Sequence, residues 1–185
     1  GHRVAVIEMA TASGLALLPP DQRDPWQTTS RGTGELLRAA ADAGARVVLL
    51  GVGGSATHDL GLGALGALGF RFLDRDGAPI DPPVPAHWDR IVRIEAPRGL
   101  SLPPVAIACD VTNPVLGPRG AAAVYGPQKG LRSEDLPRLE AASLRLADLL
   151  STACGRPAAL RDVPGAGAAG RSEEHTSELQ SPLNI

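Results

Sequence analysis

The stretch RVVLLGVGGSATHD, residues 46–59, decides the fold of this chain. Residues 46–50 form an apolar run of strand length, which is typical of a strand buried on both faces of a parallel sheet. The run leads directly into a glycine-rich loop, and the Gly/Ala/Leu-rich sequence behind it predicts a helix over about residues 59–68. A strand, a glycine loop and a helix in direct succession predict one unit of an α/β fold.

The flanking sequence extends this pattern in both directions. Leu36, Leu37, Ala40 and Ala43 recur at helical spacing, and Gly44 stands where such a helix would end. The remaining predicted elements are strands at 3–9, 91–95 and 105–109, a pair of short strands within 70–80 around an Asp-Gly turn, and a long helix from about 133 to just before 155. We therefore predict an α/β fold with a mixed or mostly parallel sheet and flanking helices.

Composition excludes several classes of protein. The chain has 185 residues and a formal net charge of −2, with a sequence pI near 6.1. This charge gives no basic surface for nucleic acid or for an anionic membrane, and no apolar run is long enough to span a bilayer. Cys109 and Cys154 show no metal-binding spacing and are predicted to be reduced thiols. We expect a cytoplasmic protein whose partners are small molecules, and the sequence leaves the oligomeric state open.

The two ends of the sequence are unlike the rest. Residues 171–185, RSEEHTSELQSPLNI, follow a Gly/Ala stretch and resemble the translation of a sequencing adapter. We interpret them as a non-native, disordered tail that takes no part in the fold or the function. The chain opens on GHRVAVIEMA, which indicates a strand entered partway, so we expect a piece of a larger protein.

The first candidate site is the loop GVGGSATHD at 51–59. A strand, a glycine turn and a helix in succession direct backbone N–H groups and the positive end of a helix dipole toward one point, which suits a phosphate or carboxylate. We expect Gly53, Gly54, Ser55 and Thr57 to bind such an anion, and Asp59 either to cap the helix or to hold a metal-bound water. The structural alternative is a glycine turn that only permits tight packing.

The same loop is open to a second interpretation. Gly51, Gly53 and Ala56 fit the loose dinucleotide fingerprint, and Asp74 lies near the spacing of a ribose-binding carboxylate. This alternative predicts an NAD-dependent oxidoreductase. The literal G-x-G-x-x-G at Gly61 falls inside the predicted helix, where we interpret it as a close-packing feature.

The second candidate loop, CDVTNP at 109–114, follows another predicted strand. Asp110, Thr112 and Asn113 would lie at the carboxyl edge of the sheet, where α/β proteins bind ligands. A carboxylate and an amide oxygen are suitable ligands for Mg²⁺, and Asp110 is the predicted metal ligand. The alternative is an Asx-turn in which Asn113 is fixed by Pro114.

Two further loops carry candidate anion-binding groups. The chain has seventeen arginines and one lysine, Lys129, in the loop YGPQKG at 125–130. A lysine retained in so arginine-rich a chain favours a specific role, neutralisation of a phosphate, over a solvated surface position. In TTSRGTGE at 28–35, Ser30 and Thr33 are either anion ligands or helix caps. We interpret His58 as a solvated loop residue.

These loops carry a resemblance to a known family. The chain resembles the bacterial glycerate kinases over residues 4–170, in the segments EMATASGL (8–15), TTSRGTGEL (28–36), GVGGSATHDLGLGALGALG (51–69), ACDVTNPVLGPRGAAAVYGPQKG (108–130) and PGAGAAG (164–170). His58 departs from the family pattern, in which Asn is more frequent. The resemblance implies ATP-dependent phosphorylation of D-glycerate, with Mg²⁺ as partner of the nucleotide and the 2-position favoured.

The resemblance also implies an architecture. The family has two α/β domains and about twice this length, so residues 1–170 would be mainly the inserted domain, and this chain alone would be inactive. Phosphoryl transfer depends on positioning and charge neutralisation. We therefore expect Asp110 and Asn113 to orient Mg²⁺ or the attacking hydroxyl, and Lys129 to neutralise the transferring charge. A partial domain without catalytic activity remains a third possibility beside the kinase and the oxidoreductase.

Overall fold

The chain folds around a three-stranded parallel sheet. The computed structural model describes residues 3–109, 113–114 and 116–155. Strands β1 (Val4–Glu8), β2 (Val47–Gly51) and β5 (Val105–Ala108) lie in the order β1-β2-β5, and both pairings are parallel. Gly51 at the end of β2 pairs with Ala108 at the end of β5, so the loops that follow these strands leave the same edge of the sheet. The predicted α/β class is confirmed.

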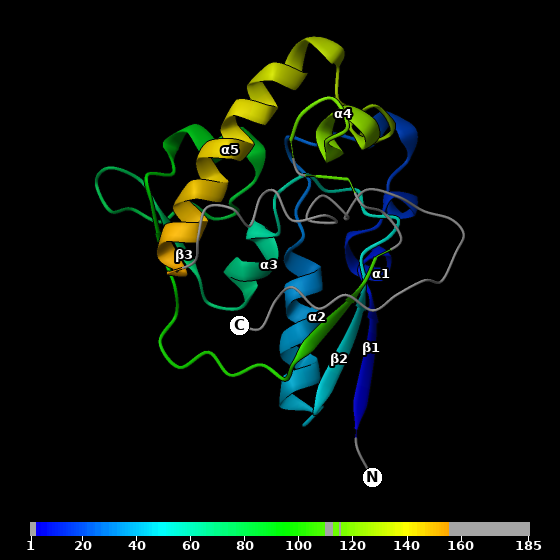
Figure 1. Ribbon diagram of the computed structural model, residues 1–185, viewed down its shortest axis with the longest axis vertical. Helices are drawn as coiled ribbons and strands as arrows, with labels where there is room; N and C mark the ends of the chain where they lie inside the picture. Colours follow the sequence, from blue (N-terminus) through cyan, green and yellow to red (C-terminus); the bar gives the residue numbers. More distant parts are fainter. Residues whose placement is uncertain (1–2, 110–112, 115, 156–185) are drawn as a thin grey trace.

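Helix α2 (Arg31–Asp42) lies along one face of this sheet (Figure 1). Ile7 of β1 and Val48 of β2 pack with Leu37 of α2 in a buried cluster. That contact explains the apolar spacing predicted for this helix. The apolar side chains on the face toward the sheet are buried there, and their removal from water stabilises the fold. The opposite face of the sheet carries valines that are more than one-third exposed, namely Val4, Val6 and Val47.

A second, two-stranded sheet differs from the sequence prediction. β3 (Arg71–Leu73) pairs antiparallel with β4 (Arg93–Glu95), whereas the sequence predicts two strands within residues 70–80. The predicted turn is present, with Gly77 at φ +79°, but the chain after it forms only an isolated bridge to β3 at Pro79. Proline has no N–H to donate to a ladder, so the segment does not continue as a strand.

A second cluster of buried apolar side chains is completed by a long helix late in the chain. Helix α5 (Leu136–Ala153) follows a short 3₁₀ turn, η5 (Ser133–Asp135), so the helix predicted from residue 133 begins as 3₁₀ and continues as α. Leu139 and Leu146 of α5 are fully buried beside Trp88. In the part of the chain that the structure describes, neither α5 nor any other helix has the length and apolar character needed to cross a membrane.

The remaining elements are short and lie mainly at the carboxyl edge of the parallel sheet (Figure 1). They are the helices α1 (Ala10–Ser13), α3 (Leu62–Ala67) and α4 (Ala121–Tyr125) and the 3₁₀ turns η1 (Leu15–Leu17), η2 (Pro20–Gln22), η3 (Pro85–Arg90) and η4 (Pro127–Lys129). Helix α3 begins three residues later than the sequence predicts, because Asp59 and the two residues after it form a turn ahead of the helix.

Two glycines allow α2 and α3 to pack with their backbones in contact. A Cβ atom at Gly34 of α2 would overlap the carbonyl oxygen of Ala64 in α3. A Cβ atom at Gly63 of α3 would overlap Thr29 Oγ1 and approach Arg31 N and Asp59 Oδ2 to 2.8 Å each. The close-packing interpretation of the glycines in this helix is therefore correct for Gly63.

We expect Gly63→Ala to lower the free energy of unfolding by about 2–3 kcal/mol, because the added methyl has no space beside Thr29 and Arg31. Gly66→Ala in the same helix is the matched control. Its Cβ would lie 3.5 Å from Phe72, an ordinary contact, and alanine favours a helix over glycine by up to about 1 kcal/mol. Urea denaturation of both variants tests the difference, and equal midpoints would contradict the packing argument.

Candidate functional site

The glycine loop at the end of β2 is held by the segment after α1. Leu15 N donates to Gly54 O at 2.8 Å, and Ala56 N donates to Ser13 O at 2.9 Å. These bonds flank an isolated antiparallel bridge between Gly14 and Ser55. Gly53 remains exposed and Gly54 half-buried, whereas every residue from 55 to 59 is buried. The loop therefore presents backbone to solvent at its glycines and turns its polar side chains inward.

Asp59 is the centre of hydrogen bonding at the end of this loop. Its Oδ2 accepts from Ser30 N and Ser30 Oγ, both at 2.7 Å, and from Gly63 N at 3.1 Å. Its Oδ1 accepts from Gly61 N at 3.1 Å. The carboxylate thus binds the N–H groups at the start of α3, where the sequence pattern predicts an external anion. The side chain of Asp59 already supplies an anion at that end of the helix.

Lys129 reaches the glycine loop from the turn η4. Its Nζ donates to Ser55 Oγ at 3.0 Å and to Thr57 O at 2.6 Å, and the residue is only 2% exposed. Burial lowers the pKa of Lys129 to about 8, and the nearby Asp59 carboxylate opposes that shift. Lys129 is therefore not a solvated surface residue. It brings the third predicted loop into contact with the first.

Ser30, just before α2, and Thr33, in its first turn, join the same group of side chains. Ser30 Oγ donates to Asp59 and accepts from Ala64 N at 3.0 Å, while Thr33 Oγ1 lies 3.0 Å from Ser13 Oγ. Neither hydroxyl caps α2, because both bond to other segments. We call this buried group the polar cluster; its members are Ser13, Ser30, Thr33, Ser55, Thr57, His58, Asp59 and Lys129.

His58 corrects the sequence interpretation of a solvated residue. It is 7% exposed, and its Nε2 has no hydrogen-bond partner among the residues that the structure describes. Burial, with a smaller contribution from the positive charge of Lys129, lowers the pKa of His58 from 6.5 to about 4. The imidazole is therefore neutral near pH 7.

Acidification should destabilise the protein through this histidine. Its pKa is lower in the folded state than in the unfolded state, so the unfolded state binds the proton first and stability falls as pH drops from 6.5 to 4. The expected contribution is about 3 kcal/mol. In urea denaturation at a series of pH values, His58→Gln should remove this component. His87→Gln, at a half-buried histidine near the second sheet, is the control for the loss of an imidazole.

The second predicted loop is only partly described. Asn113 Nδ2 donates to Arg119 O at 2.8 Å, and its Oδ1 accepts from Tyr125 Oη at 2.6 Å. The amide thus links the loop after β5 to α4. Asp110 and Thr112 lie outside the described residues, so the structure assigns neither of them a partner.

Comparison with known proteins places this geometry in a family. The sequence profile of the glycerate kinase family matches residues 1–172. The chain belongs to the glycerate kinase family. It is 48% identical over 174 residues to the glycerate kinase of Bacillus subtilis (strain 168) and 42% identical over 171 residues to the glycerate 2-kinase of Escherichia coli (strain K12). Each alignment covers 91% of this chain and 44% of the relative.

A solved structure agrees with this assignment. The crystal structure of the "putative glycerate kinase 2" of Salmonella typhimurium LT2 superposes with a TM-score of 0.83 at 46% identity. The superposition covers 91% of this chain and 45% of that chain. The sequence described here therefore spans less than half the length of the glycerate kinases that it matches.

The described residues of this family member show no cluster of metal-ligating side chains. Both carboxylate oxygens of Asp59 accept hydrogen bonds from protein donors, and Asn113 Oδ1 accepts from Tyr125. Within 3–109, 113–114 and 116–155, no three His, Cys, Asp or Glu side chains gather as metal ligands. The predicted ligand Asp110 lies outside these residues, and its role stays a prediction.

The dinucleotide-binding interpretation is wrong. Asp74 follows β3, which belongs to the two-stranded sheet and not to the parallel sheet that carries the glycine loop. Its Oδ1 accepts from Asp76 N at 3.0 Å and Ala78 N at 2.8 Å, so the carboxylate stabilises its own turn. The glycerate kinase family accounts for the loop instead.

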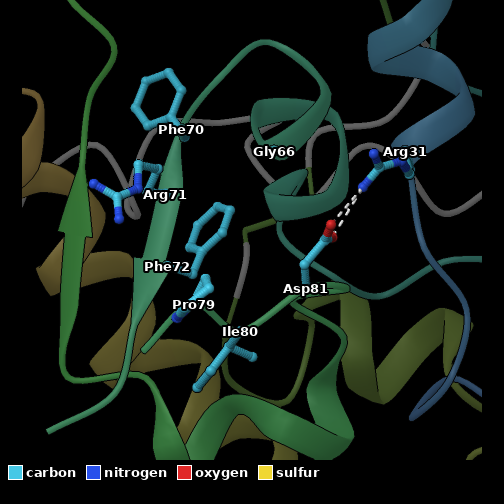
Figure 2. A pocket seen from close by; sticks show the side chains of 8 residues that line it. All are labelled: Arg31, Gly66, Phe70, Arg71, Phe72, Pro79, Ile80 and Asp81. Carbon is cyan, nitrogen blue, oxygen red and sulfur yellow. Dashed lines mark hydrogen bonds and ion pairs between the residues drawn. The ribbon is translucent and has the colours of Figure 1, made fainter. Parts of the chain in front are cut away.

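A small cavity of about 160 Å³ lies elsewhere, between the start of α2, helix α3 and β3 (Figure 2). Its apolar lining includes Phe70, Phe72, Pro79 and Ile80. Arg31 Nη1 donates to Asp81 Oδ1 at 2.9 Å beside it, as Figure 2 shows. The cavity contains none of the site residues predicted from the sequence, so we do not assign it to the family's chemistry.

Proposed function

We propose that the protein carrying this sequence transfers the γ-phosphoryl group of ATP to D-glycerate, with the 2-hydroxyl as acceptor. Membership of the glycerate kinase family supports the reaction class. The names of the relatives from Bacillus subtilis and Escherichia coli support the substrate, and the second supports the 2-position. In this reaction the glycerate hydroxyl oxygen forms a bond to the γ-phosphorus, the bond from that phosphorus to the β,γ-bridging oxygen breaks, and ADP and the hydroxyl proton leave.

The convergence of the glycine loop and Lys129 is the observation that carries the proposal. Phosphoryl transfer requires little covalent assistance, and enzymes promote it by positioning the reactants and stabilising charge. The positively charged Nζ of Lys129 lies within hydrogen-bond distance of Ser55 Oγ and of Thr57 O. Gly53 is exposed in the same loop and has no side chain, so backbone can approach an anion there. We propose that this loop holds an anionic group of glycerate or ATP.

The rigid polar cluster supplies the positioning. The loop is fixed by the segment after α1, by Ser30 through Asp59, and by Lys129. Thr28 Oγ1 also donates to Ala56 O at 3.1 Å. A loop held from several segments loses little conformational entropy when a ligand binds, which is the advantage of a preorganised site.

The test uses the longest protein encoded by the reading frame that contains this sequence, here called the complete protein. Incubation with ATP and D-glycerate, followed by phosphorus NMR, should show 2-phosphoglycerate and ADP. Reactions without glycerate, and with L-glycerate, serve as controls. A product phosphorylated at the 3-position would overturn the regiochemistry. Absence of any phosphoglycerate, from a protein shown to be folded, would overturn the proposed function.

A further inference from the structure

Two opposite charges are buried together in the polar cluster. Lys129 and Asp59 are each only 2% exposed. The ammonium of Lys129 bonds to Ser55 Oγ and to Thr57 O, two neutral groups of the glycine loop. A buried ammonium without a negative charge nearby tends to lose its proton, because the protein interior solvates charge poorly. The charge of Lys129 therefore depends on the groups around it.

Among the residues that the structure describes, Asp59 supplies the negative charge that acts on Lys129. Burial lowers the pKa of the lysine to about 8, and the Asp59 carboxylate opposes that decrease. The carboxylate accepts hydrogen bonds from Ser30, Gly61 and Gly63. These bonds stabilise the ionised carboxylate and leave its charge in place.

The other titratable or charged groups beside the lysine supply no negative charge. His58 on the glycine loop is neutral near pH 7, because burial lowers its pKa to about 4. Arg23 approaches the turn η4 with a permanent positive charge, and its Nη1 lies 3.5 Å from the carbonyl oxygen before Lys129. In α4, which precedes the turn, the hydroxyl of Tyr125 donates a hydrogen bond. Within the described part of the chain, Asp59 is thus the group that favours the protonated lysine.

The charge of Lys129 matters for the glycine loop as a whole. Lys129 bonds to this loop, and Gly53 of the loop is exposed to solvent. An anion bound at the exposed backbone does not have to touch the lysine, because a charge in the weakly polarisable interior acts over several ångströms. A neutral amine would give the anion no such stabilisation. The protonation of Lys129 therefore controls the electrostatic potential of the loop.

We propose that Asp59 is a positioning residue that acts through Lys129: its carboxylate keeps the buried lysine positively charged at neutral pH and also fixes the end of the glycine loop. This proposal rests on the proposed function and deepens it by naming the group that controls the charge of the binding loop. Activity should be lost as pH rises and Lys129 loses its proton. Removal of the Asp59 charge should move that loss to lower pH.

The first experiment measures the protonation of the lysine directly. The complete protein is labelled with carbon-13 at the ε-carbon of lysine and titrated by NMR, and the resonance missing from Lys129→Met identifies Lys129. We expect the wild-type resonance to titrate near pH 8. In Asp59→Asn the titration should move down by about one pH unit or more. Titration at the same pH in both proteins would overturn the proposal.

Two control variants separate the charge of Asp59 from its hydrogen bonds. Ser30→Ala removes a donor to the carboxylate and leaves the charge, so Lys129 should titrate as in the wild type. Asp89→Asn removes an exposed carboxylate and should also leave the titration unchanged. A shift in Ser30→Ala as large as that in Asp59→Asn would refute the role of the charge, because both variants would then act through loop packing.

The wild-type protein gives an answer even if Asp59→Asn does not fold. A Lys129 that is already neutral at pH 7 in the folded wild type would overturn the proposal. A Lys129 that is charged at pH 7, although it is buried, would support it.

The second experiment follows the consequence for the reaction. For the wild type, kcat/KM for D-glycerate should fall about tenfold per pH unit above about pH 8. In Asp59→Asn the decline should begin about one pH unit lower, and in Ser30→Ala it should begin where it does in the wild type. The residual activity of Lys129→Met should show no such decline. A decline at the same pH in Asp59→Asn and the wild type would contradict the proposal.

The two proposals fail in different ways. If the complete protein phosphorylates no glycerate, the proposed function fails, while the NMR titration still decides whether Asp59 maintains the charge of Lys129. If the protein is active and Lys129 titrates independently of Asp59, the function stands and the assignment of Asp59 fails.

Discussion

Lys129→Met in the complete protein is expected to lower kcat/KM for D-glycerate by well over tenfold, a loss of more than about 1.4 kcal/mol of transition-state stabilisation. The substitution keeps the length of the side chain and removes its charge. Lys129 is buried against Ser55 and Thr57, so water and counterions cannot replace that charge in the substituted protein. Steady-state kinetics of ADP release measures the effect.

A nearby cation provides the matched control. Arg132 lies three residues further along, with an exposed side chain paired to Glu134 and Asp135. Arg132→Met should leave kcat/KM close to the wild-type value, because exposed ion pairs are screened by solvent. Thermal unfolding of both variants separates a loss of folding from a loss of catalysis. Near-normal turnover by a folded Lys129→Met variant would show that the lysine has no part in the chemistry.

Asp59→Ala should lower the free energy of unfolding by about 3–5 kcal/mol, because each buried donor left without an acceptor costs about 1–3 kcal/mol. The substitution removes the acceptor for Ser30 and for the N–H groups of Gly61 and Gly63. It also removes the negative charge that favours the protonated form of Lys129, so the pKa of the lysine should fall further. Urea denaturation measures the first effect.

An exposed aspartate supplies the comparison for this variant. Asp89→Ala should change the free energy of unfolding by no more than about 0.5 kcal/mol, because surface substitutions away from special features have small effects. The free energy of unfolding of Asp59→Asn should lie between those of Asp59→Ala and Asp89→Ala, since its amide oxygen replaces only one of the two carboxylate oxygens. If Asp59→Ala were as stable as Asp89→Ala, the central place of Asp59 in the polar cluster would be contradicted.

Local sequence patterns were sufficient to predict most of the secondary structure. The apolar run at 46–50 predicts β2 to within one residue, and the helical spacing, which predicts a helix over about 33–43, places α2 to within two residues of its observed bounds. The hairpin at 70–80 was predicted incorrectly because its turn is local, whereas the strand that pairs with β3 comes from residues 93–95. Sequence spacing carries no information on that distant pairing.

The candidate loops were recognised from their composition. Their contact with one another in the folded chain was not predicted. Lys129 bonds to Ser55 across 74 residues, and Ser30 to Asp59 across 29. No periodicity links such positions, so the sequence suggested separate anion sites where the structure has one buried cluster. His58 was misjudged for the same reason. A histidine between a threonine and an aspartate in a glycine loop resembles a solvated residue until the segments that cover it are known.

The burial of Lys129 also affects whether this chain can accept arginine in place of its lysine. One A-to-G change converts the lysine codon AAG to the arginine codon AGG, and the other cations of the chain are all arginine. At position 129 a single nitrogen bonds a hydroxyl and a carbonyl within an enclosed space, and a planar guanidinium with five N–H groups cannot reproduce that arrangement. A drift toward G and C that replaces exposed lysines by arginine at little cost would therefore be selected against at this codon.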